Sequence, residues 1–158
     1  MQLTLYTDYS LRVLVYLSLH EENSSTISEI ADFYQISRNH LVKVVHNLSL
    51  KNYINSTRGK GGGLRLARSP AEIEVGAVIR DTEPNFDVVE CFSKEPSAKV
   101  YNIEPICSLK SILGKAMDSF LATLDGYTIA DVIKNIPKEG VIDNSYNIVD
   151  ISQLNNKN

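Results

Sequence analysis

The fold of this chain is decided by residues 26–48, whose sequence is TISEIADFYQISRNHLVKVVHNL. Thr26 followed three residues later by Glu29 is the pattern of a capping box, which predicts the start of a short helix. A tight turn at 34–36 then leads to a second helix, with Ser37 as its N-cap. The apolar residues of that second helix share one face, at the i, i+3, i+4, i+7 spacing: Leu41, Val44, Val45 and Leu48. Two short helices joined by such a turn predict a helix-turn-helix.

The opposite face of the second helix is polar and basic. In a helix-turn-helix the N-terminal residues of the second helix face the base edges of the major groove. We therefore predict DNA contacts from Arg38, Asn39, His40 and Lys43. An ordinary helical hairpin inside a core is the alternative, and the local excess of positive charge disfavours it.

Two β-capable runs flank the segment RGKGGG at residues 58–63. The second run alternates apolar and polar side chains, which is typical of a half-buried strand. The pattern predicts a β-hairpin wing whose tip binds DNA through Arg58, Lys60 and Gly61, since glycine allows positive φ and cations suit phosphates or a narrow minor groove. A phosphate-binding P-loop is excluded because no Gly-Lys-Ser/Thr follows.

The charge of the chain is unevenly distributed. Its formal net charge is −3, which by itself disfavours a nucleic acid as partner, but residues 38–68 hold seven Lys and Arg and no Asp or Glu. Seven positive charges within a −3 chain leave −10 for the remainder. Because association with a polyanion depends on the local field, this pattern indicates double-stranded DNA as the partner.

The flanking sequence extends this core in both directions. Upstream, an apolar stripe from residue 11 to residue 19 predicts a first helix capped by Thr7 or Asp8. Downstream, Ile73 and Val75 predict a short strand, and residues 76–80 predict a short helix.

A long amphipathic helix is predicted from Leu109 to Leu124, ended by Gly126, and a short helix follows Thr128. The apolar stripe of the long helix is too extensive to stand alone, and packing against a second copy of the chain buries it. We therefore expect a homodimer, and two recognition helices one DNA turn apart imply a palindromic operator.

The expected architecture is mostly α with a small β-hairpin wing. It comprises a winged helix-turn-helix domain at 1–80, a sensor loop at 81–107, a helical dimerisation arm at 108–136 and a polar tail at 137–158. Without a membrane-length apolar run or a signal peptide, we expect a cytoplasmic protein with no membrane partner. Nothing indicates an enzyme, because no nucleophile–base or paired-carboxylate pattern stands out and every histidine lies in the DNA-binding half.

Cys91 and Cys107 are the two cysteines of the chain. Two are too few for a disulfide scaffold, so that free thiols, metal ligands and a redox pair all stay open. Zinc is disfavoured because no histidine follows His46.

The order of these motifs resembles a known family. The motifs are MQLT at 1–4, TDY at 7–9, SRNHLVK at 37–43, RGKGG at 58–62, LK at 109–110, SFL at 119–121 and DGYT at 125–128. Over residues 1 to about 134 they are similar to the NsrR/IscR-type winged-helix transcription regulators, and most of all to the nitric-oxide-sensitive branch.

The resemblance implies an iron–sulfur cluster held in the loop before the long helix, whose damage by nitric oxide weakens DNA binding. Cys91 matches the first family cysteine, and Cys107 matches the third, within IEPICSLK at 103–110. Asp8 matches the carboxylate ligand that comes from the partner subunit. Tyr101 stands where the middle cysteine is expected, and a four-iron cubane usually takes four ligands. The expected cofactor is therefore a 2Fe–2S or 4Fe–4S cluster with two thiolates and other donors.

Two alternatives to the cluster remain. The thiols could form a reversible disulfide that senses oxidants, or the protein could hold no metal. The leading hypothesis is a homodimeric repressor that senses nitric oxide or redox state through an iron–sulfur or thiol site. The alternative is a cofactor-free winged-helix regulator controlled by a partner protein, which would be colourless where a cluster gives brown protein.

Overall fold

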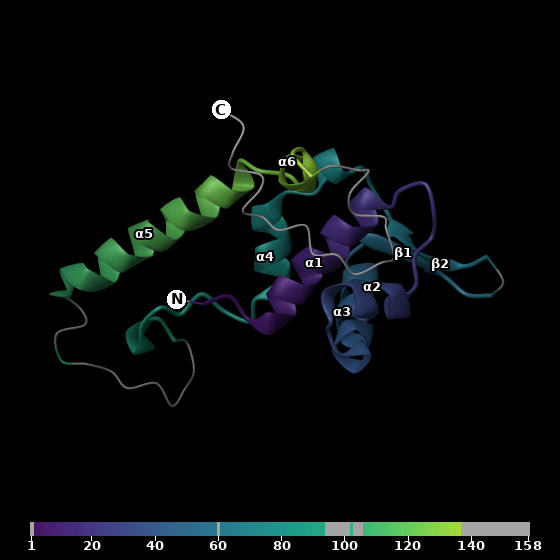
Figure 1. The fold of residues 1–158 in the computed structure, drawn as a ribbon. Helices are drawn as coiled ribbons and strands as arrows, with labels where there is room; N and C mark the ends of the chain where they lie inside the picture. Colours follow the sequence, from purple (N-terminus) through teal and green to yellow (C-terminus); the bar gives the residue numbers. More distant parts are fainter. Residues whose placement is uncertain (1, 60, 94–101, 103–105, 137–158) are drawn as a thin grey trace, which may run out of the picture.

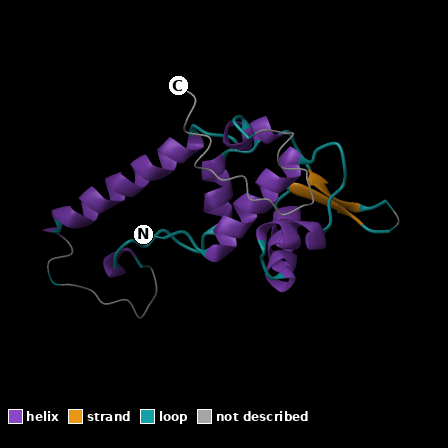
Figure 2. Ribbon diagram, viewed as in Figure 1, coloured by secondary structure: helices purple, strands orange, loops and turns teal. Residues whose placement is uncertain are grey.

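The computed structural model describes residues 2–59, 61–93, 102 and 106–136. As predicted, it is mostly helical, with a two-stranded antiparallel hairpin (Figure 1; Figure 2). The elements are α1 (Leu5–Leu19), α2 (Ile27–Tyr34), α3 (Arg38–Leu50), β1 (Ile54–Thr57), β2 (Gly63–Leu66), the 3-10 turn η1 (Pro70–Glu72), α4 (Val75–Thr82), the 3-10 turn η2 (Glu90–Phe92), α5 (Ser108–Asp125) and α6 (Ile129–Ile133). The predicted polar tail, 137–158, lies outside the described residues.

Helix α1 begins about one turn earlier than predicted. Thr4 is the N-cap, and its side-chain oxygen accepts a hydrogen bond from the Thr7 amide at 3.3 Å. Thr7, a predicted cap, is instead buried within the helix, and the Asp8 amide donates to the Thr4 carbonyl. The prediction was wrong because several polar residues precede the apolar stripe and only the tertiary fold selects the capping hydroxyl. Asp8 therefore lies in the first turn of α1, where the helix dipole favours a carboxylate.

The helix-turn-helix forms as predicted. Thr26 and Glu29 close a capping box at the start of α2, and Gln35 ends that helix in the left-handed region, at φ 54°. Ser37 is at the N-cap of α3, although its side chain makes no capping hydrogen bond there. The predicted apolar face of α3 is buried against α1 and α2: Leu41, Val44, Val45 and Leu48.

The predicted wing is also present. Strands β1 and β2 pair antiparallel, from Ile54 opposite Leu66 to Thr57 opposite Gly63. At the tip, Gly59 and Gly61 have φ of 100° and 82°, which L residues rarely adopt. The wing projects from the helical body at the end away from α5 (Figure 1).

The C-terminal part of the described chain returns to the core. Helix α6 packs against α1 and η1, and Ile129 is fully buried. The Val75 amide donates to the Tyr127 carbonyl, and the Ile129 amide donates to the Ile73 carbonyl, both at 2.9 Å. The short strand predicted for Ile73 and Val75 is wrong, because only an isolated bridge between Glu74 and Thr128 forms and Val75 already begins α4.

Helix α5 spans 18 residues and extends away from the body (Figure 1). Its C-terminal end is attached, since Leu121 and Leu124 pack against the core and Asp125 pairs with Arg80. Its N-terminal half exposes apolar side chains, with Leu109 at 59% and Ile112 at 61% exposure. Within the described ranges, no helix has the length and apolarity needed to cross a membrane.

Candidate nucleic-acid interface and sensor residues

The predicted DNA-contacting residues of α3 are all on the surface. Arg38, Asn39, His40 and Lys43 are exposed, in the first half of a helix whose other face is buried. This burial holds the helix rigidly while its polar residues stay in water, as a recognition helix requires.

The basic residues of the 38–68 segment divide into two groups in the structure. Three of them are held within the molecule: Lys51 pairs with Asp81, Arg65 donates to backbone carbonyls, and Arg68 lies over the ring of Tyr53.

The second group is Arg38, Lys43 and Arg58, which are exposed and make no ion pair with any described residue. Their charge is therefore available to an external polyanion. Together they lie on the recognition helix and the wing. A count of charges along the sequence does not distinguish these three cations from the others. Lys60, the second cation predicted at the wing tip, lies outside the described residues.

Two tyrosines of α1 contact the recognition helix, which the sequence analysis missed. The rings of Tyr9 and His40 stack with centroids 6.3 Å apart, and the Tyr6 hydroxyl donates to the Lys43 carbonyl at 3.4 Å. Both tyrosines flank Asp8 in the first turns of α1. The only sequence signal is the presence of two aromatic residues in an otherwise polar helix start.

The Asp8 carboxylate already has a partner in the single chain. It accepts a hydrogen bond from Arg12 Nε at 2.8 Å, one helical turn along α1. The Arg12 guanidinium also lies 5.5 Å from the ring centre of Tyr34 on α2, a cation–π contact. Burial raises the pKa of Tyr34 to about 12.

Cys91 lies in η2 and Cys107 is the N-cap residue of α5, so that the two thiols bracket the segment before the arm. Both are half-buried and neither is in a disulfide. Within the described part of one chain, no three His, Cys, Asp or Glu side chains converge on a metal position. The described donors of one chain therefore do not by themselves make up the ligand set of a cluster.

The last turn of α4 connects the start of the sensor loop to the DNA-binding elements. Asp81 accepts hydrogen bonds from Lys51 Nζ at 2.9 Å and from the Tyr53 hydroxyl at 2.7 Å. Burial acts to raise the pKa of Asp81, but these two hydrogen bonds outweigh it and hold the pKa below 3.8. Glu83 Oε1 accepts from the Thr4 amide at 2.7 Å and so joins the same turn to the start of α1.

A helix-turn-helix with an exposed cationic recognition helix and a glycine-rich wing defines a winged-helix DNA-binding transcription regulator. The chain belongs to the Rrf2 family, described as an iron-dependent transcriptional regulator, whose model matches residues 3–135.

Individual relatives agree with this assignment. The chain is 46% identical over 136 residues to the HTH-type transcriptional regulator NsrR of Bacillus subtilis (strain 168), which covers 85% of this chain and 92% of that protein. It is 47% identical over 136 residues to NsrR of Bacillus licheniformis, over 85% of this chain and 94% of that protein.

Solved structures share the fold. The T. potens IscR structure matches with a TM-score of 0.68 at 26% identity, over 89% of this chain and 91% of that one. The structure of CymR (YrzC), the global cysteine regulator of B. subtilis, matches with a TM-score of 0.69 at 23% identity, over 85% and 97%. The protein is thus a DNA-binding transcription regulator and not an enzyme.

Proposed function

We propose that this protein is a homodimeric repressor that binds a palindromic operator and responds to nitric oxide or redox state through Cys91 and Cys107. The DNA-binding part of this proposal rests on one observation: some basic residues of the 38–68 segment have partners within the molecule, and others have none among its described residues. Arg38, Lys43 and Arg58 stay exposed and without an ion pair to any described residue, on the two elements that a winged helix presents to DNA.

The DNA contacts are tested by the salt dependence of operator binding. Each phosphate that a cation neutralises adds about −0.9 to the slope of log K against log salt. The double variant Arg38→Ala/Lys43→Ala should bind operator far more weakly and with a shallower slope. Lys115→Ala, an exposed cation on α5, is the matched control and should bind as the parent does. Unchanged binding by the double variant would reject this interface.

The proposal of a dimer and a palindromic operator is supported by the apolar surface of α5. The N-terminal half of α5 exposes a row of apolar side chains that the described chain does not cover. A two-fold interface lets each copy bury the stripe of the other, and it places two recognition helices on one operator. Sedimentation at micromolar concentration should give a dimer, and a footprint should cover two symmetric half-sites.

The sensor is proposed to combine Cys91 and Cys107 with Asp8 of the partner subunit. Both cysteines are free thiols, and no three donors converge among the described residues of one chain, which supports a ligand set that a second subunit completes. An iron–sulfur cluster bound there would supply the reactivity towards nitric oxide. Asp8 is held by Arg12 in the single chain, and a carboxylate is a weaker iron ligand than a thiolate, so the site should bind iron loosely.

The test is anaerobic purification with iron and sulfide counts and a visible spectrum. The parent should be coloured, while Cys91→Ala and Cys107→Ala should lose iron and Asp8→Ala should lose it faster on exposure to air. Asp118→Ala, an exposed aspartate of α5, is the control. Colourless parent protein whose operator binding ignores nitric oxide and oxidants would overturn the sensor. A colourless protein that gains a Cys91–Cys107 disulfide on oxidation would instead establish thiol sensing.

A further inference from the structure

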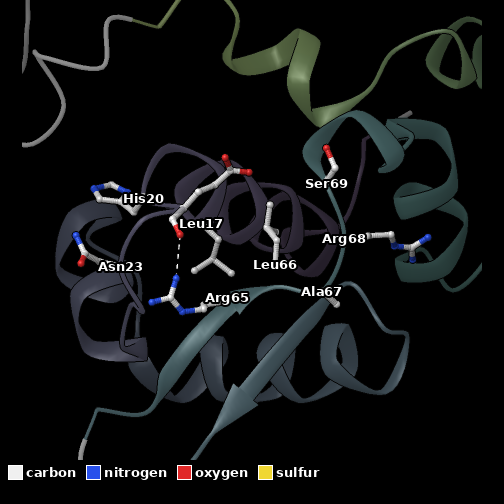
Figure 3. Close-up of a pocket in the computed structure, with 9 residues that line it drawn as sticks. Leu17, His20, Asn23, Arg65, Leu66, Ala67, Arg68 and Ser69 are labelled. Atoms are coloured by element: carbon white, nitrogen blue, oxygen red, sulfur yellow. Dashed lines mark hydrogen bonds between the residues drawn. The ribbon is translucent and has the colours of Figure 1, made fainter.

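Arg65 belongs to the basic segment by sequence, but in the structure it points towards the end of α1. Its Nη1 donates to the Glu21 carbonyl at 2.9 Å and to the Glu22 carbonyl at 3.4 Å, and Nη2 also reaches the Glu22 carbonyl at 3.4 Å. Figure 3 shows the guanidinium of Arg65 reaching from β2 towards the end of α1, with the first of these hydrogen bonds dashed. Arg65 and its neighbours there line an open hollow of about 390 Å³. The planar guanidinium of Arg65 therefore holds the turn that follows α1 against the wing.

Two further contacts join the same turn to the wing. Ser25 and Leu64 form an isolated antiparallel bridge, with amide-to-carbonyl distances of 3.1 Å and 2.7 Å. The Ser24 hydroxyl donates to the Gly62 carbonyl at 3.2 Å. The part of β2 next to the tip of the wing is thus attached to the α1–α2 connection, and Arg65 is the charged member of this attachment.

We propose that Arg65 is a positioning residue that sets the angle of the wing for DNA binding and does not itself contact the phosphates. The proposal rests on the proposed function, in which the wing tip contacts the operator through Arg58. Each strand has four residues, and Arg58 and Gly59 lie beyond the paired register, so the hairpin needs an external attachment to hold its tip in place. Without it, binding would have to order a moving wing, and that conformational entropy would be lost on association.

The conservative substitution separates positioning from charge. Lysine keeps the positive charge of Arg65 but lacks the fork that reaches two carbonyls. If Arg65 positions the wing, Arg65→Lys and Arg65→Ala should both weaken operator binding, roughly tenfold for the loss of charge-assisted hydrogen bonds. The salt slope should stay that of the parent in both. If Arg65 instead binds a phosphate, Arg65→Lys should bind as the parent does and Arg65→Ala should lower the slope by about one.

Double-mutant cycles distinguish positioning of the wing from a general effect on the fold. If Arg65 acts through the wing tip, Arg65→Ala and Arg58→Ala should be non-additive, because the cost of ordering a loosened wing arises only while Arg58 makes the wing contact. Arg65→Ala and Lys43→Ala should be additive, because Lys43 binds from the recognition helix. A purely structural loss would lower the thermal midpoint and would be additive with both partners.

The outcomes also separate this proposal from the function on which it rests. Arg58→Ala with parental affinity would overturn the DNA-contacting wing itself, and with it the positioning role. Weaker binding by Arg58→Ala together with parental binding by Arg65→Ala would overturn the positioning role alone. Full rescue by Arg65→Lys, with a reduced slope for Arg65→Ala, would assign Arg65 to the phosphates.

Discussion

The wing and the outer half of α5 both project from the same body, at opposite ends of it, but they differ in what surrounds them (Figure 1). The wing is polar at its tip and is attached to the body through β2, by Arg65 and by the Ser25–Leu64 bridge. The outer half of α5 carries exposed Leu109 and Ile112, and its attachment to the body lies at the other end of the helix.

This difference separates a task that one chain can perform from the one for which we propose two chains. A polar wing is stable in water, and one chain alone can place it for DNA. The outer half of α5, with Leu109 and Ile112 each about 60% exposed, offers an apolar face that a second chain could cover. The four expectations below test that contrast, in order of decreasing effect.

The largest effect is expected on the arm. Ile112→Glu places a charge in the centre of the proposed two-fold interface, where its burial without a partner costs several kcal/mol. The variant should sediment as a monomer or become insoluble, and its operator affinity should fall about a hundredfold or more, because the second half-site is lost. Ser111→Glu, one residue away and also exposed, is the control and should remain dimeric. A dimeric Ile112→Glu would place the interface elsewhere.

The second largest effect is expected where α5 packs against α4, on the stability of the protein. A Cβ on buried Gly76 would meet the Asp125 carboxylate and would lie 3.0 Å from the Asp125 amide. Gly76→Ala should therefore destabilise the protein by about 2–3 kcal/mol in denaturant unfolding, as overpacking does. Gly114→Ala is the matched control on α5, because nothing lies within 4 Å of its added Cβ.

Alanine also favours helix over glycine by roughly 0.5–1 kcal/mol, so Gly114→Ala should stabilise the arm. Destabilisation by Gly114→Ala, or a weaker dimer, would show that the second chain approaches α5 closely at this glycine.

The tip end of β2 should respond more moderately. Gly63 has φ 151°, and an added Cβ would lie 2.8 Å from the Ser24 Cβ. Gly63→Ala should cost about 1–2 kcal/mol of stability through backbone strain and should weaken operator binding by displacing the wing. Gly61→Ala has a positive φ as well but open space around it, so it reports the strain alone. Equal operator affinities for the two variants would mean that the contact with Ser24 does not place the wing.

The smallest effect is expected on how the free energy of unfolding depends on pH, through the ionisation of Asp81. Its pKa in the folded protein lies below 3.8, so its pairing with Lys51 and Tyr53 contributes fully above the unfolded pKa and is lost as pH falls through the lowered folded value. Because the pair is partly exposed, Asp81→Asn should cost only about 0.5–1 kcal/mol at neutral pH. The difference from the parent in denaturant unfolding should shrink as the pH falls through the lowered pKa of Asp81 in the folded protein. Asp118→Asn is the control, and a difference independent of pH would show that the charge of Asp81 contributes nothing.

Local signals in the sequence predicted most of the fold because their causes are local. The capping box at Thr26, the i, i+3, i+4, i+7 face of α3 and the glycines of the wing tip each depend on residues a few positions apart. Where several local solutions existed, the prediction was wrong. Thr4 caps α1 in place of Thr7 or Asp8. Val75 begins α4 where a strand was expected, and the only β-pairing there among the described residues is an isolated bridge between Glu74 and Thr128.

For the candidate site, the sequence by itself determined the composition: a basic segment, a glycine-rich tip, two cysteines and one early aspartate. Only the tertiary structure decided how those groups are used, since their partners are far away in sequence. Lys51 is neutralised by Asp81, Arg65 is held by the carbonyls after α1, and Arg38, Lys43 and Arg58 stay exposed. Charge can be counted along a chain, but whether it is available to DNA depends on which acceptors folding brings within hydrogen-bond distance.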